Sequence, residues 1–218
     1  MFTGIIEATG TIETLEPREG TTRIGVSAPA YAGRLRKGDS IAVSGTCLTA
    51  LEMEPPVFYA DLAAETLGRT SLGRLRPGSV VNLELPTVAG APLGGHVVQG
   101  HVDGCGELVS FDPVRADGDP ELTDWWLRVR VPENTKAYML EKGSIAIEGI
   151  SLTIATWDGD IVGVAILPHT RKATNLHVLR ARDPLNVEAD VMIKLAVEQK
   201  QPRTTFAVTL EYLLANGY

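Results

Sequence analysis

One ten-residue segment is present twice in the chain. Residues 40–49 read SIAVSGTCLT and residues 144–153 read SIAIEGISLT, so that six of the ten positions are identical. The same offset of 104 residues aligns Thr66 with Thr170, Thr70 with Thr174, and residues 81–84 with residues 185–188. A repeat that continues without a gap limits the architectures open to a chain. We therefore expect one small domain that has been duplicated.

The starts of the two halves also match, but at a different offset. Residues 4–10, GIIEATG, correspond to residues 100–106, GHVDGCG, at an offset of 96. The second half thus carries about eight extra residues, which fall near residues 112–121. A unit of about 100 residues can bury its own core. We predict an N-terminal barrel over residues 1–97, a C-terminal barrel over residues 98–195 and a C-terminal helical segment over residues 196–218.

Composition and charge narrow the function. Apolar residues make up 44% of the chain and charged residues 22%, and no apolar run approaches the ~20 residues that cross a bilayer. The net charge of -7 is spread without a basic block, so neither nucleic acid nor an anionic membrane is an expected partner. The N-terminus has no signal-peptide pattern, and Cys47 and Cys105 are not equivalent in the repeat. We expect a cytoplasmic protein whose two cysteines need not form a disulfide.

Short strands separated by turns dominate each half. In the first half the pattern predicts strands over residues 2–15, 21–28, 40–44, 47–53, 57–62 and 80–85, and short helices over 30–35 and 63–67. The second half repeats this plan, with a strand over 125–131 and a clearer helix over 132–141. An all-β fold follows, made of two tandem six-stranded Greek-key barrels, which leave few exposed edges.

Beyond Asp190 the spacing of the apolar residues changes to that of a helix. Residues 191–199 and 205–215 carry apolar side chains at helical spacing, and Pro202 is expected to interrupt them. These residues have no counterpart in the first half. The predicted C-terminal α-helix could pack on the barrels or build an oligomer, and the sequence leaves both open.

Several motifs, in order along residues 1–195, carry a family resemblance. They are MFTGIIE (1–7), GTCLT (45–49), ETL (65–67), GGHVVQGHVDG (94–104), GISLT (149–153) and LPHT (167–170). Together they resemble the riboflavin synthase family of the alpha-chain type. The resemblance implies two lumazine-binding barrels per chain, a homotrimer, and no metal or other cofactor. It leaves an association with lumazine synthase open.

The resemblance also implies a reaction, the last step of riboflavin biosynthesis. One 6,7-dimethyl-8-ribityllumazine transfers a four-carbon unit to a second, which gives riboflavin and 5-amino-6-(D-ribitylamino)uracil. Two identical reactants require two similar pockets held face to face, and their orientation lowers the barrier. A duplicated barrel supplies two such pockets. If barrels of neighbouring chains meet, the active site exists only in the oligomer.

The resemblance assigns residues to each pocket. The first pocket receives Gly4, Ile5, Ile6, Cys47, Leu48, Thr49, Asp61, Leu62, Ala63, Ala64, Glu65 and Thr66, with Gly100, His101 and Val102 reaching it from the partner or the neighbouring barrel. The second receives Lys142, Ser151, Leu152, Thr153, Ile166, Leu167, Pro168, His169, Thr170 and Arg171. Hydroxyl and backbone groups in these segments suit the amide edges and ribityl hydroxyls of a lumazine.

The chemistry suggests catalytic candidates. The methyl group at C7 of a lumazine is acidic because its carbanion delocalises into the ring, so a base and a nucleophile that adds at C7 would suffice. His101 is the candidate base or proton shuttle, because histidine changes charge near neutral pH. Cys47 is the candidate nucleophile or polar group of the first pocket. Ser151, Thr153 and Asp190 are the candidates of the second barrel.

Plainer interpretations stay open for these residues. Cys47 could be a core residue, and Glu148 and Asp190 could be solvated. His96, His101, Asp103 and Cys105 could be metal ligands, but their spacing fits no strong metal motif, and no metal is predicted. The segment 175–184 lacks the glycine and Pro-Gly turn of Gly73 and Pro77-Gly78, so we expect the rim of the second barrel to be shaped differently.

Other functions compete with the enzyme. A duplicated barrel could hold a lumazine or flavin without converting it, as in the related lumazine proteins of luminous bacteria; Cys47, His101 and Ser151 favour the enzyme. The flavin barrel of a reductase would be followed by a nicotinamide-binding α/β domain, for which this chain is too short. An oligosaccharide- or nucleic-acid-binding barrel would need aromatic platforms or a basic face, and aromatic residues make up only 6%.

Overall fold

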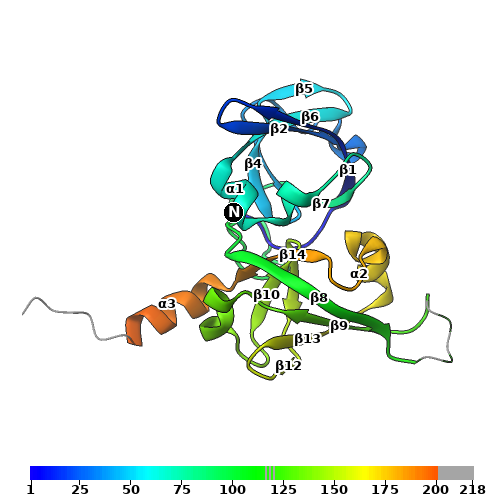
Figure 1. Cartoon of the computed structure of the whole chain (residues 1–218), viewed down its shortest axis with the longest axis vertical. Helices are drawn as coiled ribbons and strands as arrows, with labels where there is room; N and C mark the ends of the chain where they lie inside the picture. Colours follow the sequence, from blue (N-terminus) through cyan, green and yellow to red (C-terminus); the bar gives the residue numbers. More distant parts are fainter. Residues whose placement is uncertain (116, 118, 120, 201–218) are drawn as a thin grey trace, which may run out of the picture.

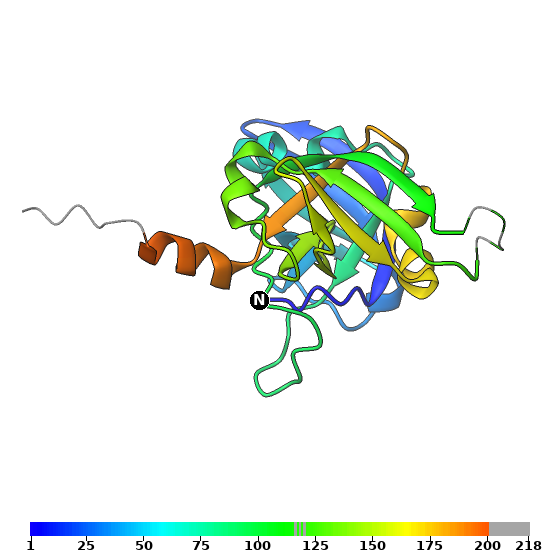
Figure 2. The same ribbon diagram turned by 90° about the horizontal axis from the view of Figure 1, so that it is seen from below.

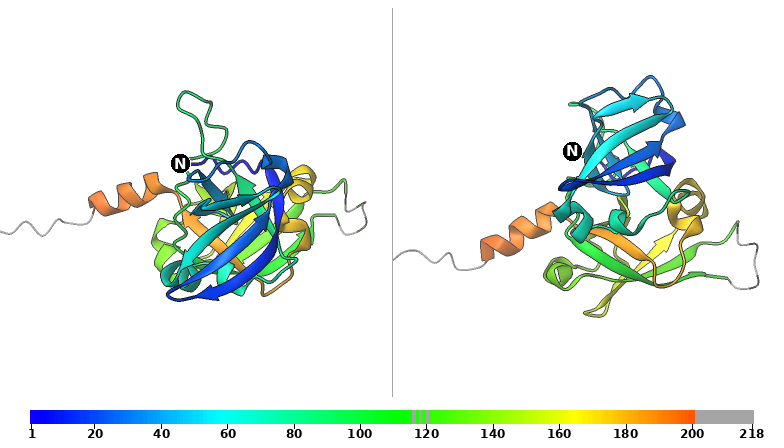
Figure 3. Two further views of the ribbon diagram at one scale, coloured as in Figure 1. Left: turned by 90° about the horizontal axis from the view of Figure 1, so that it is seen from above. Right: turned by 45° about the horizontal axis from the view of Figure 1, so that its top comes forward.

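The protein consists of two seven-stranded antiparallel sheets, each curled into a barrel-like unit. The structure is a computed structural model that describes residues 1–200 apart from 116, 118 and 120. The first sheet and the second are stacked one above the other, with the N-terminus between them (Figure 1, and the right-hand view of Figure 3). The mainly β, duplicated architecture predicted from the repeat is confirmed.

The first sheet has the strand order β4-β3-β7-β1-β2-β6-β5. Its strands are β1 (Ala8–Arg18), β2 (Thr21–Ser27), β3 (Ser40–Val43), β4 (Thr46–Thr49), β5 (Glu52–Glu54), β6 (Val57–Ala63) and β7 (Val80–Glu84). Its helical turns are η1 (Pro29–Tyr31), α1 (Ala64–Arg69) and η2 (Ser71–Arg74). Seven strands are present instead of six because the predicted strand 47–53 divides into β4 and β5. At the division, Ala50 N donates to Asp39 O and Leu51 N donates to Tyr59 O.

The second sheet repeats this order as β11-β10-β14-β8-β9-β13-β12. Its strands are β8 (Gly104–Pro113), β9 (Trp125–Arg130), β10 (Ser144–Ile147), β11 (Ile150–Thr153), β12 (Thr156–Trp157), β13 (Ile161–Ile166) and β14 (Pro184–Ala189). Its helical elements are η3 (Glu133–Tyr138), α2 (Pro168–Ala173) and η4 (Asn175–Val178), followed by α3 (Val191–Lys200). The helix expected over 132–141 is thus a shorter 3₁₀ helix. The extra residues of the second half lengthen the connection between β8 and β9.

Each barrel has its own apolar core. In β6, the side chains of Phe58, Ala60 and Leu62 are fully buried and alternate with more exposed neighbours, as expected for a strand with one face in a core. The same alternation buries Leu127 and Val129 of β9. The two cores are separate clusters, one within each sheet. Each pocket can therefore be formed on an independently packed barrel.

The two barrels meet through equivalent residues. Gly45 and Gly149 both have a positive φ, 80° and 78°, and pack against each other so closely that a Cβ on Gly45 would lie 2.7 Å from Gly149 N. A small third core lies beside them and is made of two further equivalent pairs, Phe2 with Val98 and Ala42 with Ala146. Phe2 and Val98 also form an antiparallel bridge. The junction thus has an approximate two-fold symmetry.

Two asparagines complete this junction symmetrically. Asn82 Nδ2 donates to Glu148 O at 2.9 Å, and the equivalent Asn186 Nδ2 donates to Ser44 O at 2.8 Å. The Oδ1 of Asn82 accepts from Asn175 N at 2.7 Å, and that of Asn186 accepts from Ser71 N at 2.6 Å. These bonds join each barrel to the helical turns of the other.

Glu148 lies inside the junction, so its interpretation as a solvated residue was wrong. Its side chain is buried, and its carboxylate accepts hydrogen bonds from Asn186 N at 2.7 Å and from Asn175 Nδ2 at 2.8 Å. Burial raises the pKa of Glu148, and these donors oppose the shift. The equivalent residue in the first half is Ser44, so only the second half contributes a carboxyl group at this position of the junction.

The turn at residues 180–183 keeps the shape of its equivalent at 76–79, so the missing Pro-Gly sequence does not alter this part of the rim of the second barrel. Arg182 adopts φ of 76° where the first half has Gly78 at 90°. Both turns are closed by the same backbone bond, Ser79 N to Arg76 O at 2.9 Å and Asp183 N to Arg180 O at 3.0 Å. The side chains also bond equivalently: Arg76 N donates to Ser79 Oγ, and Arg180 N donates to Asp183 Oδ2. These bonds hold the turn even where an arginine replaces glycine.

The helix α3 confirms the predicted helix over residues 191–199. It projects from the second barrel (Figures 1 and 2), and Met192 and Leu195 expose 61% and 52% of their surface. The predicted helical residues 205–215, and Pro202, lie outside the described residues. Among the helices of the described part of the chain, none has the length and apolar character needed to span a bilayer.

Candidate functional site

A cavity of about 370 Å³ opens on the second barrel. It brings together seven of the residues predicted for the second pocket: Lys142, Ser151, Leu152, Thr153, Ile166, Leu167 and Thr170. Ala155 and Ala165 also line it and were not predicted. The lining combines aliphatic side chains with three hydroxyl groups and one cation. Such a lining suits a ligand with a flat ring system and a polar chain.

Local structure explains how these residues meet. Strand β11 carries Ser151 and Thr153, and β13 ends at Ile166, directly before Leu167 and α2. Lys142 precedes β10 in a tight turn in which its N–H donates to Ile154 O at 2.8 Å. Lys142 has φ of 67°, a left-handed conformation that strains a residue with a Cβ. Its equivalent in the first half is Gly38, which has no Cβ and adopts this conformation without strain. Strain of this kind is often retained at functional sites.

Three residues predicted for the second pocket do not line this cavity. Pro168 and His169 begin α2, and His169 is exposed. The guanidinium of Arg171 lies over the ring of Trp125 at 4.1 Å and pairs with Glu121 at 3.6 Å. Arg171 therefore fixes the neighbouring β8–β9 hairpin, and its role in ligand binding stays a prediction.

Ser151 is paired with a histidine that the sequence did not assign to this pocket. Nδ1 of His96 lies 2.7 Å from Oγ of Ser151, and only 8% of His96 is exposed. Burial lowers the pKa of His96, and the nearby charge of Asp190 opposes this shift. Ser151 and His96 thus form a hydrogen-bonded pair, and the predicted candidate Asp190 acts on this histidine through its charge. Thr153 is exposed two residues further along β11.

Gly95 allows His96 to reach Ser151. A Cβ at position 95 would lie 2.1 Å from Thr3 O and 2.8 Å from Ser151 Oγ, so no larger residue fits. The chain between the two halves passes here directly over β11. His96 belongs to the segment 94–104 that carries the family resemblance, and this was the sequence signal for a role in the site. The sequence analysis considered His96 only as a metal ligand.

The N-terminal segment covers the second pocket, so its assignment to the first pocket was wrong. Ser151 N donates to Gly4 O at 2.8 Å, and a Cβ on Gly4 would lie 2.7 Å from Ser151 Cβ. Ile5 is exposed beside it, and Ile6 packs against the core of the second barrel. The repeat shows which segments are equivalent but not on which barrel each one lies.

The matching segment of the second half covers the first barrel. Cys47 N donates to Gly100 O at 2.8 Å, and a Cβ on Gly100 would lie 2.6 Å from Cys47 Cβ. Gly100 thus reaches Cys47 from the neighbouring barrel of the same chain, one of the two arrangements expected, and the part of His101 and Val102 in this pocket stays a prediction. Cys47 is a half-buried free cysteine, and His101 is exposed.

The rest of the first pocket differs from the second in charge. Asp61 is the equivalent of Ala165 and forms an ion pair with Arg23 at 2.8 Å, and Arg23 also pairs with Glu52 at 2.8 Å. The Arg23 guanidinium lowers the pKa of Asp61. The remaining predicted residues lie as follows: Leu48 and Leu62 are buried in the core, Thr66 is half-buried, and Thr49, Ala63, Ala64 and Glu65 are exposed.

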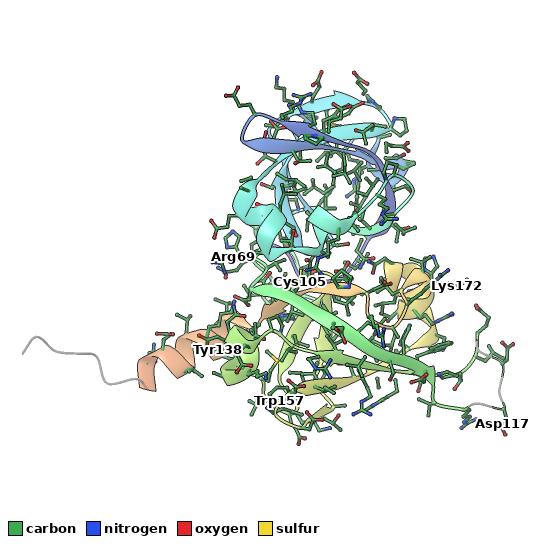
Figure 4. All side chains as sticks on the ribbon, viewed as in Figure 1. Arg69, Cys105, Asp117, Tyr138, Trp157 and Lys172 are labelled. Carbon is green, nitrogen blue, oxygen red and sulfur yellow. The ribbon has the colours of Figure 1, made fainter. Side chains whose placement is uncertain are left out.

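The four residues considered as metal ligands bind different partners. His96 contacts Ser151, the N–H of His101 donates to Glu188, and Asp103 pairs with Lys194 at 2.7 Å. Cys105 Sγ donates to Arg69 O at 3.5 Å, at the point where α1 of the first barrel meets β8 (Figure 4). Their side chains do not converge.

Comparisons with known proteins agree with the duplicated fold. Residues 3–86 and 99–190 match the lumazine binding domain. The chain is 40% identical to riboflavin synthase of Mycobacterium bovis over 89% of this chain and 95% of that protein, and 35% identical to riboflavin synthase of Bacillus subtilis over 100% of both. A crystal structure of LumP complexed with riboflavin is 25% identical, with a TM-score of 0.77 over 87% of this chain and 99% of LumP.

Two lumazine-binding repeats, each with a glycine of the other repeat packed against its equivalent strand, define the class of this protein. The resemblance seen in the sequence is confirmed by these relatives. The chain belongs to the riboflavin synthase family and is an enzyme of that class.

Proposed function

We propose that the protein converts two molecules of 6,7-dimethyl-8-ribityllumazine into riboflavin and 5-amino-6-(D-ribitylamino)uracil. The observation that carries this proposal is a pair of equivalent contacts between the two barrels: Gly100 lies against Cys47 of the first barrel, and Gly4 lies against Ser151 of the second. A reaction between two identical molecules needs two similar sites. Because the atoms of the two lumazines equal those of the two products, the transfer needs no oxidant or reductant.

The differences between the pockets suit the different tasks of donor and acceptor. In the second pocket, Ser151 Oγ is bonded to His96, and Asp190 lies near that histidine. This group can activate a hydroxyl for addition at C7, or accept a proton from the C7 methyl group. In the first pocket, Cys47 provides a thiol and the exposed His101 follows the glycine that binds it. Thr153 supplies a further hydroxyl to the second pocket.

The complete active site would be formed between chains. The first barrel of one chain would face the second barrel of a neighbour, within the homotrimer implied by the family. A monomer would then bind lumazine and react poorly. Light scattering gives the oligomeric state, and co-sedimentation with lumazine synthase tests an association with that enzyme. Cytoplasmic localisation, tested by fractionation, belongs to the same proposal.

The experiment that tests the reaction is an anaerobic incubation with the lumazine alone. Riboflavin absorbance and the released pyrimidinedione are followed together. The proposal expects the two products in a 1:1 ratio without any added cofactor. The absence of both products in the folded, ligand-saturated protein would overturn it.

One observation favours a second candidate, a binding protein without turnover. LumP, which is complexed with riboflavin in its crystal structure, has the same fold over nearly its whole length. For this candidate, lumazine and riboflavin would bind tightly and neither would be converted. The Ser151–His96 pair favours the enzyme, since binding alone needs no buried histidine on a pocket hydroxyl.

A further inference from the structure

Two buried glutamates occupy equivalent positions in the two sheets. Glu84 ends β7 and Glu188 lies in β14, and each exposes only 3% of its surface. Neither has been assigned a role in the pockets. Since a buried carboxylate is costly unless it is well bonded, the same cost at two equivalent positions calls for an explanation.

Each carboxylate binds the backbone of the glycine segment in its own half. Glu188 Oε1 accepts from Gln99 N at 2.7 Å, and Oε2 accepts from Gly100 N and His101 N, both at 3.0 Å. Glu84 Oε1 accepts from Thr3 N at 2.7 Å, and Oε2 accepts from Gly4 N at 3.0 Å. A carboxylate suits such consecutive N–H donors, whereas an amide offers only one oxygen.

Each of these segments in turn rests on the pocket of the opposite barrel. Gly100, held by Glu188 of the second sheet, accepts from Cys47 N in the first barrel. Gly4, held by Glu84 of the first sheet, accepts from Ser151 N in the second barrel. The two contacts cross, so the carboxylate of each barrel is connected through one glycine residue to the pocket residue of the other.

The charged groups around the two carboxylates differ. Asp103 and Lys194 face Glu188 and form an ion pair with each other, while Glu7 is the charged neighbour of Glu84. Burial raises the pKa of both carboxyls, that of Glu188 to about 6. Glu188 therefore changes its protonation state closer to neutral pH than an ordinary glutamate.

We propose that Glu188 is a positioning residue for the first-barrel pocket and that Glu84 is one for the second-barrel pocket. Each acts through the glycine segment that it holds, and neither touches the ligand. The catalytic consequence rests on the proposed function. The crossed connection itself does not, and it is measured without ligand.

The test compares Glu188→Gln with Glu84→Gln by hydrogen exchange at the Cys47 and Ser151 amides. We expect Glu188→Gln to speed exchange at Cys47 about tenfold or more and to leave Ser151 within about twofold, because opening of each amide follows its own glycine segment. Glu84→Gln should give the reverse. The two variants are matched controls, and a purely structural role would loosen the mutated barrel or both barrels alike. Either of those patterns would overturn the proposal.

A second measurement needs no variant and so does not depend on folding of the mutants. The N–H bonds of Gln99 and Gly100 favour the ionised carboxyl, and a local opening loses them while Glu188 stays buried. In the wild-type protein, protection of the Cys47 amide, corrected for the intrinsic exchange rate, should therefore fall as the pH drops through about 6, although protonation opposes global unfolding. Protection that stays constant between about pH 5 and pH 7, the range of that titration, would contradict the role of Glu188.

Turnover with the lumazine separates this proposal from the proposed function. With an active wild-type enzyme, each variant should lower kcat about tenfold or more, a loss of the size expected when reacting groups are misplaced by a fraction of an ångström. If the wild type is inactive but the crossed exchange pattern is present, the proposed function fails and the positioning role stands. If turnover is normal in both variants, the catalytic consequence is wrong.

Discussion

Nδ1 of His96 lies 2.7 Å from Oγ of Ser151, so a buried histidine and a pocket hydroxyl form one hydrogen-bonded pair. Nε2 of the same ring is buried and has no hydrogen-bond partner among the described residues. A buried nitrogen without a partner is costly unless a ligand or water supplies one. The pair is thus prepared for a polar ligand atom.

From this pair we predict that His96→Gln and Ser151→Ala each lower kcat by about 10²-fold or more, the usual range for loss of a general acid or base. Because the two side chains act together, the double variant should be hardly worse than either single variant. Steady-state kinetics with the lumazine measure this. His177→Gln is the matched control, since His177 Nδ1 contacts Thr174 O outside the pocket. Fully additive losses would show that the pair does not act as a unit.

The buried carboxyl of Glu188 predicts how stability changes with pH. Burial raises its pKa from 4.5 to about 6, so the folded protein binds this proton more tightly than the unfolded chain. The stabilising contribution is therefore complete below pH 4.5 and is lost as the pH rises through about 6. The loss is on the order of 2 kcal/mol.

Urea unfolding of the wild type and of Glu188→Gln measures this contribution. The difference between their unfolding free energies should shift by about 2 kcal/mol in favour of the variant as the pH rises from about 4.5 to 7.5. Glu84 and Glu148 also have raised pKa values, and comparison of the two proteins cancels their effect. A difference that does not change with pH would contradict the titration of Glu188.

The family resemblance made most of the second pocket predictable. Ser151 and Thr153 lie in the repeated segment 144–153 and Lys142 lies two residues before it, and the structure gathers all three around one cavity. The division of strand 47–53 was not predicted, because no proline or glycine marks it. It depends on bonds from Ala50 and Leu51 to residues distant in the sequence.

The repeat could not predict that each glycine segment contacts the barrel of the other half. Gly4 and Gly100 are equivalent in sequence, yet equivalence does not tell which barrel each segment covers. His96 was missed for a related reason, since a residue 96 positions earlier would precede Met1 and no internal comparison includes it. Glu148 was misjudged because its burial arises only where the two barrels meet.

Replacement of Lys142 by glycine should change the stability of the fold and the affinity for lumazine in opposite directions. Replacement by glycine would remove the left-handed strain at φ of 67° and stabilise the fold by up to about 1 kcal/mol. It would also remove the one cation among the described residues that line the second cavity, so lumazine affinity should fall. Thermal unfolding and fluorescence titration with lumazine measure the two effects. Arg182→Gly is the matched control, with φ of 76° but no place in that cavity, and it should gain stability while it keeps affinity.

The contact between Gly45 and Gly149 predicts where the molecule tolerates no side chain. In Gly149→Ala the new Cβ would lie 2.6 Å from Gly45 N, a backbone atom that cannot move aside without separating the barrels. Together with the left-handed backbone at 78°, this should destabilise the protein by about 3 kcal/mol or more. Gly20→Ala is the control, because Gly20 has a similar φ of 75° and nothing within 4 Å of its Cβ position. Its cost should be about 1 kcal/mol, from the backbone alone. Equal losses in the two variants, measured by chemical unfolding, would show that the close approach of the barrels contributes nothing to stability.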